Sequence, residues 1–195
     1  SEDGDKYVYA INGSVRYKEK EDRFKSQYFT PAKRNSGWFL DFPVEVDHKE
    51  ENIHIGSSKA GTSKGATLYI ENIKDKSKSI ATEIERLGAI GSIAVASQDK
   101  QTVFVASNDY EPGNSNVPRL LKSFNRGKRF EDLSSSTVYG SDRNYTLKEI
   151  LDYRTISDIE IDPHDNSIIF LSLTGYNKDL NGFKPNYYRI LQSSD

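Results

Sequence analysis

The chain has 195 residues, of which 35% are hydrophobic and 11% aromatic, so it can form a packed core and is not an intrinsically disordered chain. Its formal net charge is −2 and its basic residues are spread along the sequence, which argues against nucleic-acid binding, and no apolar run is long enough for membrane insertion. The absence of cysteine excludes disulfides and thiol catalysis.

The first predicted element is a hairpin close to the amino terminus. Alternating apolar residues at 7–11 and 15–17 flank Asn12 and Gly13. The Asn-Gly pair favours a tight hairpin turn because both residues readily adopt positive φ angles. We interpret this hairpin as a partial copy of the longer repeats that follow it.

Three longer repeats follow the hairpin, and each has the order strand, polar turn, strand, loop, strand. Their strands are expected at 44–46, 53–57 and 68–70, at 93–95, 103–107 and 120–121, and at 159–161, 168–172 and 187–191. Recurring units of this kind are typical of the blades of a β-propeller. The prediction is an all-β fold, a partial β-propeller of about three blades plus a partial one at the amino terminus. A β-sandwich is the alternative, because its strands and turns alternate in a similar way.

One short helix is predicted inside an insertion at about 134–155, between the second and third repeats. Residues 146–149 match a capping box. Three apolar residues fall on one helical face: Leu147, Ile150 and Leu151. The insertion either covers the face that carries the long loops or fills an edge between blades. A second segment, 80–87, is compatible with a helix and equally with a strand at the edge of a blade.

A structural turn motif occupies residues 123–130. Its members are Ser123, Asn125, Gly127 and Phe130, and a second copy begins with Ser193 and Asp195. Short Ser and Asx side chains hydrogen-bond the backbone of their own turn, and Gly supplies a positive φ. The aromatic residue is expected to pack back between neighbouring blades.

This turn motif resembles the Asp box of sialidase-like, sortilin-like and related bacterial propellers, also called BNR propellers, with Asn125 in place of the usual Asp. The stretch 156–176 is similar to the segment that opens a blade in secreted bacterial proteins of this group. The resemblance extends over 39–195, although no such box is recognisable at 71–79. It implies a secreted or cell-surface bacterial protein, so the expected location is extracellular or at the cell surface.

The whole chain, 1–195, is interpreted as a single but incomplete propeller segment. Propellers need at least about four blades to close around an axis. We therefore expect the rest of the propeller to come from another chain or from a missing part of the same gene. The absence of methionine also suggests that Ser1 is not where translation began, as in a processed or excised segment.

Candidate ligand-binding residues lie in the loops 56–66, 107–118 and 172–185, which should share one face of the propeller, opposite the Asp-box turns. They are Lys59, Lys64, Asp109, Tyr110, Glu111, Tyr176, Lys178 and Asp179. Aromatic rings stack on a ligand while polar groups hydrogen-bond it, which suits a glycan or protein ligand. The same polarity also fits ordinary surface loops.

The favoured function is a non-catalytic binding or scaffolding segment that recognises a protein or a glycan through its loop face. The alternative is part of an Asp-box-type glycoside hydrolase acting on polysaccharide, and a third possibility is a segment that only closes a larger propeller. Catalytic residues cannot be assigned, because several carboxylates are available and the arginines form no recognisable cluster. The three histidines lack the spacing of metal ligands, so we predict no metal and no cofactor.

Overall fold

The computed structural model describes fourteen stretches of the chain, namely 7–11, 14–18, 24–27, 43–47, 52–56, 65–72, 74–85, 87, 89–99, 101–107, 118–139, 143–151, 154–174 and 190–193. In the three strands that lie before residue 28 it describes the backbone alone. The predicted hairpin is present there as two strands that pair in antiparallel register, with Tyr7 opposite Lys18 and Ile11 opposite Ser14.

The strands form five antiparallel sheets. Sheet one contains β1 (Tyr7–Ile11), β2 (Ser14–Lys18) and β3 (Phe24–Gln27). Sheet two contains β4 (Val44–Asp47), β5 (Asn52–Gly56), β6 (Gly65–Asn72) and β7 (Ile80–Glu85), with the 3-10 helix η1 (Lys76–Lys78) between the last two. Sheet three contains β8 (Ile90–Val95), β9 (Val103–Ser107), β10 (Leu120–Ser123) and β11 (Glu131–Asp132). Sheet four contains β14 (Thr155–Ile161), β15 (Ile169–Thr174) and β16 (Ile190–Gln192).

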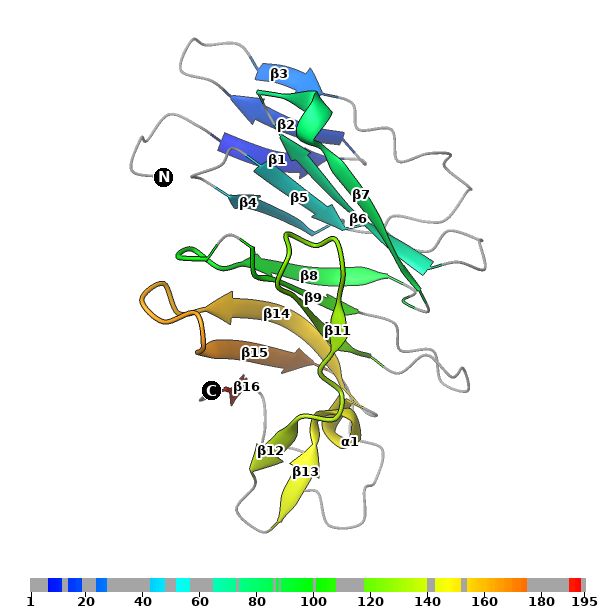
Figure 1. Cartoon of the computed structure of the whole chain (residues 1–195), viewed down its shortest axis with the longest axis vertical. Coiled ribbons are helices and arrows are strands. Elements are labelled where there is room, and N and C mark those ends of the chain that lie inside the picture. Colours follow the sequence, from blue (N-terminus) through cyan, green and yellow to red (C-terminus); the bar gives the residue numbers. More distant parts are fainter. Residues whose placement is uncertain are drawn as a thin grey trace.

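The small fifth sheet, β12 (Thr137–Tyr139) with β13 (Asn144–Thr146), and helix α1 (Leu147–Leu151) make up the insertion. In every larger sheet the strands lie side by side in chain order, and each sheet is completed before the next begins. Figure 1 shows the four larger sheets following one another along the long axis of the molecule. A sandwich distributes consecutive strands between two facing sheets. The arrangement is therefore the predicted partial propeller, with the sheets as its blades.

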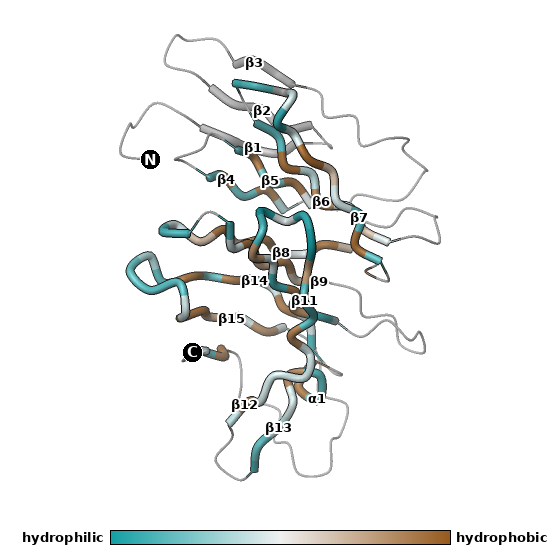
Figure 2. The backbone as a smooth tube through the Cα atoms, in the orientation of Figure 1, coloured by the Kyte–Doolittle hydropathy of each residue, from teal (hydrophilic) through white to brown (hydrophobic). Residues whose placement is uncertain are grey.

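The burial of sheet three explains why its strand β9 is a continuous apolar run in the sequence. All five residues of β9 are buried. Because side chains alternate along a strand, Val103 and Val105 belong to the core shared with sheet two, whereas Phe104 and Ala106 belong to the core shared with sheet four. Figure 2 shows the apolar residues concentrated in these central strands, while the connecting turns are polar. A strand buried on both faces has no polar side to show in its sequence.

The first strands of sheets two, three and four lie next to one another, since β8 packs against both β4 and β14. The pairing of β8 with β9 shifts register between Ile90 and Ser92, and that of β14 with β15 shifts between Ile156 and Asp158. Such bulges bend and twist a strand. Because the irregularity recurs near the start of β8 and of β14, we infer that the first strands of these two sheets bend at the same point.

The structure adds fourth strands that the sequence did not predict clearly. Segment 80–87 contains the strand β7 rather than a helix, and the short β11 completes sheet three. Residues 80, 84 and 87 have helical spacing, but Ile80 and Ile84 also alternate as a strand and pair with Ile70 and Ala66 of β6. Pairing with the edge of β6 gives hydrogen-bond partners to the backbone groups of this segment, so it forms a strand and not a helix.

Helix α1 forms where the capping box predicts it. The backbone N–H of Thr146 donates to Glu149 Oε2 at 2.7 Å, and the N–H of Glu149 donates to Thr146 Oγ1 at 3.2 Å. Its three buried residues join the core between sheets three and four, namely Leu147, Ile150 and Leu151. The helix therefore contributes to the core between these two sheets, and the role of the insertion at the loop face stays a prediction. No helix in the described ranges is both long and apolar enough to cross a membrane.

Candidate functional site

The predicted ligand-binding loop residues all fall outside the described residues. They are Lys59, Lys64, Asp109, Tyr110, Glu111, Tyr176, Lys178 and Asp179. The strands that lead into their loops are described, and β5, β9 and β15 run in the same direction (Figure 1). We call the side toward which these three strands run the loop face. The grouping of the eight residues on it stays a prediction.

The opposite side, the turn face, carries the hairpin turns. Ser97 Oγ and Gln98 Nε2 both donate to the carbonyl of Pro163, at 3.1 and 3.0 Å, which ties the first turn of sheet three to that of sheet four. The backbone N–H of Arg126 donates to the carbonyl of Gln101 at 2.8 Å. The motif turn 123–130 therefore lies beside these hairpin turns.

The turn 123–130 has the bonding that its sequence predicts. Ser123 Oγ accepts from the N–H of Gly127 at 2.9 Å and donates to Asn125 Oδ1 at 3.0 Å, while Asn125 Oδ1 accepts from the N–H of Arg129 at 2.9 Å. Gly127 has a φ of 73°. Phe130 is partly buried against the core between sheets two and three. Each of the four motif residues therefore contributes to the turn or to the packing behind it, whereas the identity of the turn as an Asp box stays a prediction.

The second predicted copy of the motif is described only at Ser193. Its Oγ accepts from the N–H of Ile169 at 2.9 Å and donates to the carbonyl of Ser167 at 2.7 Å. Asp195 lies outside the described residues. Ser193 therefore fixes the end of β16 against the start of β15.

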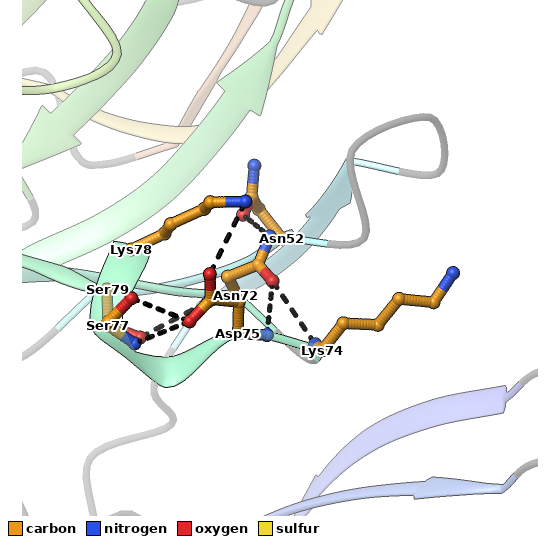
Figure 3. Close-up of polar contacts among 7 residues, drawn as sticks. All are labelled: Asn52, Asn72, Lys74, Asp75, Ser77, Lys78 and Ser79. Carbon is orange, nitrogen blue, oxygen red and sulfur yellow. Dashed lines mark hydrogen bonds and ion pairs between the residues drawn. The ribbon is translucent and has the colours of Figure 1, made fainter.

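A similar turn joins β6 to β7, although the sequence did not show it. Asn72 Oδ1 accepts from the N–H of Asp75 at 2.7 Å and from that of Lys74 at 3.2 Å, and Asp75 Oδ1 accepts from the N–H and hydroxyl of Ser77 (Figure 3). These hydrogen bonds from Ser77 hold the pKa of Asp75 below its usual range. The side chains of Asn72 and Asp75 accept backbone hydrogen bonds in this turn, as those of Ser123 and Asn125 do in the turn 123–130.

A pocket of about 340 Å³ opens beside this turn. Its lining residues come from sheet two and from the turn 123–130, and they are Asn52, His54, Ile70, Asn72, Lys78, Ile80 and Arg126. His54 pairs across the strands with Glu45 and Ile70, so it points to the face of sheet two that packs against sheet three. The sequence analysis did not identify this pocket, because its residues come from β5, β6, η1, β7 and the turn 123–130.

His54 is the most unusual residue of the pocket. It is 2% exposed, and neither ring nitrogen has a hydrogen-bond partner. Burial lowers the pKa of His54 to about 4, and nearby Asp47 opposes this shift only in part. The imidazole is therefore neutral at neutral pH and presents one donor and one acceptor.

Three carboxylates gather on the first strands of sheets two and four. Burial, with the negative charges of Glu160 and Asp158 adding to it, raises the pKa of Glu45 to about 7. Asp158 Oδ1 accepts a hydrogen bond from Ser92 of β8 at 3.2 Å. The sequence analysis assigned no catalytic residue, and it missed Glu45 and Glu160. The sequence feature that could have identified both residues is a single Glu between two β-branched residues, as in 44–46 and 159–161.

In the described part of the chain, no three His, Asp or Glu residues are grouped so that they could hold a metal ion. The chemistry available there consists of a partly buried carboxyl group that keeps its proton near neutral pH, and a polar pocket with a neutral imidazole.

Meander sheets placed side by side, with their first strands adjacent, define a segment of a β-propeller. The structure is similar to that of the GH74 xyloglucanase from Xanthomonas campestris, a β-propeller enzyme, with a TM-score of 0.57 and 14% sequence identity. The match covers 93% of this chain and 26% of that structure, so the chain spans about a quarter of its length. No family model and no curated protein matches the sequence. At this identity the likeness establishes the fold alone.

Proposed function

We propose that the chain is a non-catalytic binding or scaffolding segment of a larger propeller, which recognises a glycan or a protein through its loop face. The supporting observation is the common direction of β5, β9 and β15, because the loops that follow them then leave the same side of three consecutive blades (Figure 1). Binding residues commonly lie on loops that a rigid scaffold positions.

In this proposal the protein is extracellular or at the cell surface, and its partner is the rest of the propeller, supplied by another chain or by a further part of the same gene. The Asp-box resemblance of the turn 123–130 belongs to the same proposal. Sheet four supports it, because Leu171 joins the core with sheet three whereas Ile190 of β16 is 67% exposed on a sheet edge. A further blade would cover such a residue.

The test is binding of the 195-residue chain to a glycan array, with reducing-end release measured on the polysaccharides that bind. We expect binding without release. Tyr110→Ala and Tyr176→Ala should each weaken binding about fivefold, since a stacked ring contributes about 1 kcal/mol. Tyr139→Ala is the control, because Tyr139 is 78% exposed on the insertion, outside the three loops. Unchanged binding in both loop variants would contradict the proposal.

A second candidate function is glycoside hydrolysis, and the raised pKa of Glu45 favours it. A glycosidase needs one carboxylic acid that keeps its proton to protonate the leaving group, and a second carboxylate roughly 5 to 10 Å away. Glu45 fits the first requirement, and Asp158 and Glu160 are the neighbouring carboxylates. The similar structure is named as a xyloglucanase, so xyloglucan is a suitable first substrate to assay.

Hydrolysis is tested by reducing-end release from xyloglucan and a panel of other polysaccharides. If Glu45 is the acid, Glu45→Gln should reduce the rate by at least about 100-fold, because the amide cannot donate a proton to the leaving group. Glu83→Gln, at an exposed position on β7, should leave the rate unchanged. A wild-type chain that releases nothing from the whole panel would remove this candidate.

A further inference from the structure

We propose that the pocket on sheet two binds the carboxylate of a small hydroxylated organic acid, the chemistry shared by a uronic-acid unit of a polysaccharide and a free hydroxy acid. Asn52 begins β5 and Asn72 ends β6, and the two are paired across the strands. They therefore lie at the end of sheet two opposite Gly56 and Gly65, where the loop face begins. This site is separate from the loop-face recognition proposed above.

Charge favours an anion in this pocket. Lys78 and Arg126 supply two positive charges, and none of the described residues that line the pocket is acidic. Lys78 Nζ lies 3.4 Å from Asp75 Oδ2, but both side chains are substantially exposed, so this ion pair is weak and occupies only one of the three ammonium donors. A guanidinium beside an ammonium suits a carboxylate, because Arg can bind both carboxylate oxygens.

The two carboxamides are held in fixed orientations. Asn72 Nδ2 donates to Asn52 Oδ1 at 2.9 Å, while Asn72 Oδ1 accepts from the backbone of the turn (Figure 3). Asn52 Oδ1 therefore faces Asn72, and its amide nitrogen lies on the other side of the carboxamide. Oriented amide groups are suited to ligand hydroxyls, which both donate and accept hydrogen bonds.

His54 distinguishes this pocket from an ordinary surface hollow. A buried polar group without a partner costs about 1–3 kcal/mol, and native proteins rarely leave one unsatisfied. His54 lines the pocket beside the cationic groups, and its two unpartnered ring nitrogens are buried from solvent. In the proposed complex the imidazole turns toward the pocket, and a hydroxyl or carboxylate oxygen of the ligand supplies the missing partner.

The size of the pocket limits the ligand. A volume of about 340 Å³ lies at the lower end of the roughly 300 to 1,000 Å³ typical of ligand sites, so it fits a molecule the size of a single sugar. Ile70 and Ile80 provide an apolar wall that can contact the carbon skeleton. Inorganic anions would leave this wall unused.

The experiment is calorimetric titration of the 195-residue chain with D-glucuronate, D-glucose, acetate and sulfate. We expect D-glucuronate to bind at least about tenfold more tightly than each of the other three, because only it matches both the cations and the amides. Galacturonate trisaccharide and lactate then distinguish the sources: tighter binding of the trisaccharide indicates a polysaccharide unit, and tighter binding of lactate a free hydroxy acid. Either result supports the shared chemistry.

Matched variants separate the pocket from general charge effects. Lys78→Gln and Arg126→Gln should each weaken D-glucuronate binding at least about fivefold, whereas Lys74→Gln and Arg129→Gln, exposed in the same two turns but outside the pocket, should not. His54→Phe should weaken binding as well, with circular dichroism checking that this variant folds. Tyr110→Ala should leave binding unchanged, so failure of the loop-face proposal and failure of this one are distinguishable.

A second readout does not depend on any variant of the pocket folding. The imidazole proton resonances of His54 should titrate at higher pH when D-glucuronate is bound, because a nearby carboxylate favours the imidazolium form. Comparison with His54→Phe assigns these resonances. Equal binding of D-glucose, acetate or sulfate, unchanged binding in the Lys78 and Arg126 variants, or an unmoved His54 titration would each overturn the proposal.

Discussion

Glu45 and His54 lie opposite each other on neighbouring strands, and burial shifts their pKa values in opposite directions. Burial disfavours the charged form of both groups, so the carboxyl keeps its proton to about pH 7 and the imidazole loses its proton above about pH 4. Two adjacent titratable residues are thus both neutral over a range in which each would be charged in water. This costs folding stability and makes the pair a natural place to look for function.

The raised pKa of Glu45 predicts a pH-dependent stability. The folded protein binds the Glu45 proton more tightly than the unfolded chain does, so its contribution is fully present below about pH 4.5 and is lost as the pH rises through about 7. Glu45→Gln should therefore unfold at a higher denaturant concentration than the wild type at pH 8 and show a smaller difference at pH 5. A gap between the two proteins that does not change with pH would contradict the shift.

Gly127 carries a second residue-scale prediction. Gly127→Ala should destabilise the protein by about 1–2 kcal/mol, because its φ of 73° is strained for any residue with a Cβ. An added Cβ would also lie 2.9 Å from the side-chain ends of Leu68 and Ile70, which can move. Urea denaturation measures the effect. Lys128→Ala, at an exposed position in the same turn, should change stability by less than about 0.5 kcal/mol.

At the scale of elements, the sequence predicted the central apolar strands and the helix with its own cap. Strands β5, β9 and β15 show β-branched and aromatic runs, and α1 has its capping box. It did not predict β11, which has two residues and forms only because β10 offers an edge. The turn after β6 was missed because Asn72 and Asp75 hold it with a spacing unlike that of 123–130.

Helix α1 gives the prediction at this scale. Thr146→Ala removes the hydroxyl of the capping box and should cost about 1 kcal/mol, because a five-residue helix cannot form without its cap and its packing. Loss of α1 would expose Leu147, Ile150 and Leu151. The measurement is the melting temperature of Thr146→Ala. The control is Thr137→Ala, at an exposed position on β12, which should melt at the same temperature as the wild type. Equal melting temperatures would show that the cap contributes nothing.

For the whole molecule, the exposed edge of sheet four leads to a prediction about association. Among the described strands β16 pairs only with β15, and Ile190 is 67% exposed on it. Free strand edges with apolar side chains pair with other chains. The isolated chain should therefore self-associate at high concentration, and Ile190→Lys should reduce this, whereas Tyr139→Lys should not. Sedimentation velocity measures both, and a wild-type chain that stays monomeric would contradict the expectation.

The sequence by itself determined the repeat, the paired turns and the apolar strands, because these depend on residues close together in the chain. Only the tertiary structure decided which faces meet and what they enclose. In the sequence, His54 is one polar residue within an apolar strand. It lines a pocket because Arg126, seventy-two positions later in the chain, lies beside the same sheet. Glu45 likewise has a raised pKa because the fold buries it and because β14 brings Glu160 and Asp158 near it. Burial and the electric field of residues distant in the sequence are properties of the folded chain, so no local sequence pattern predicts them.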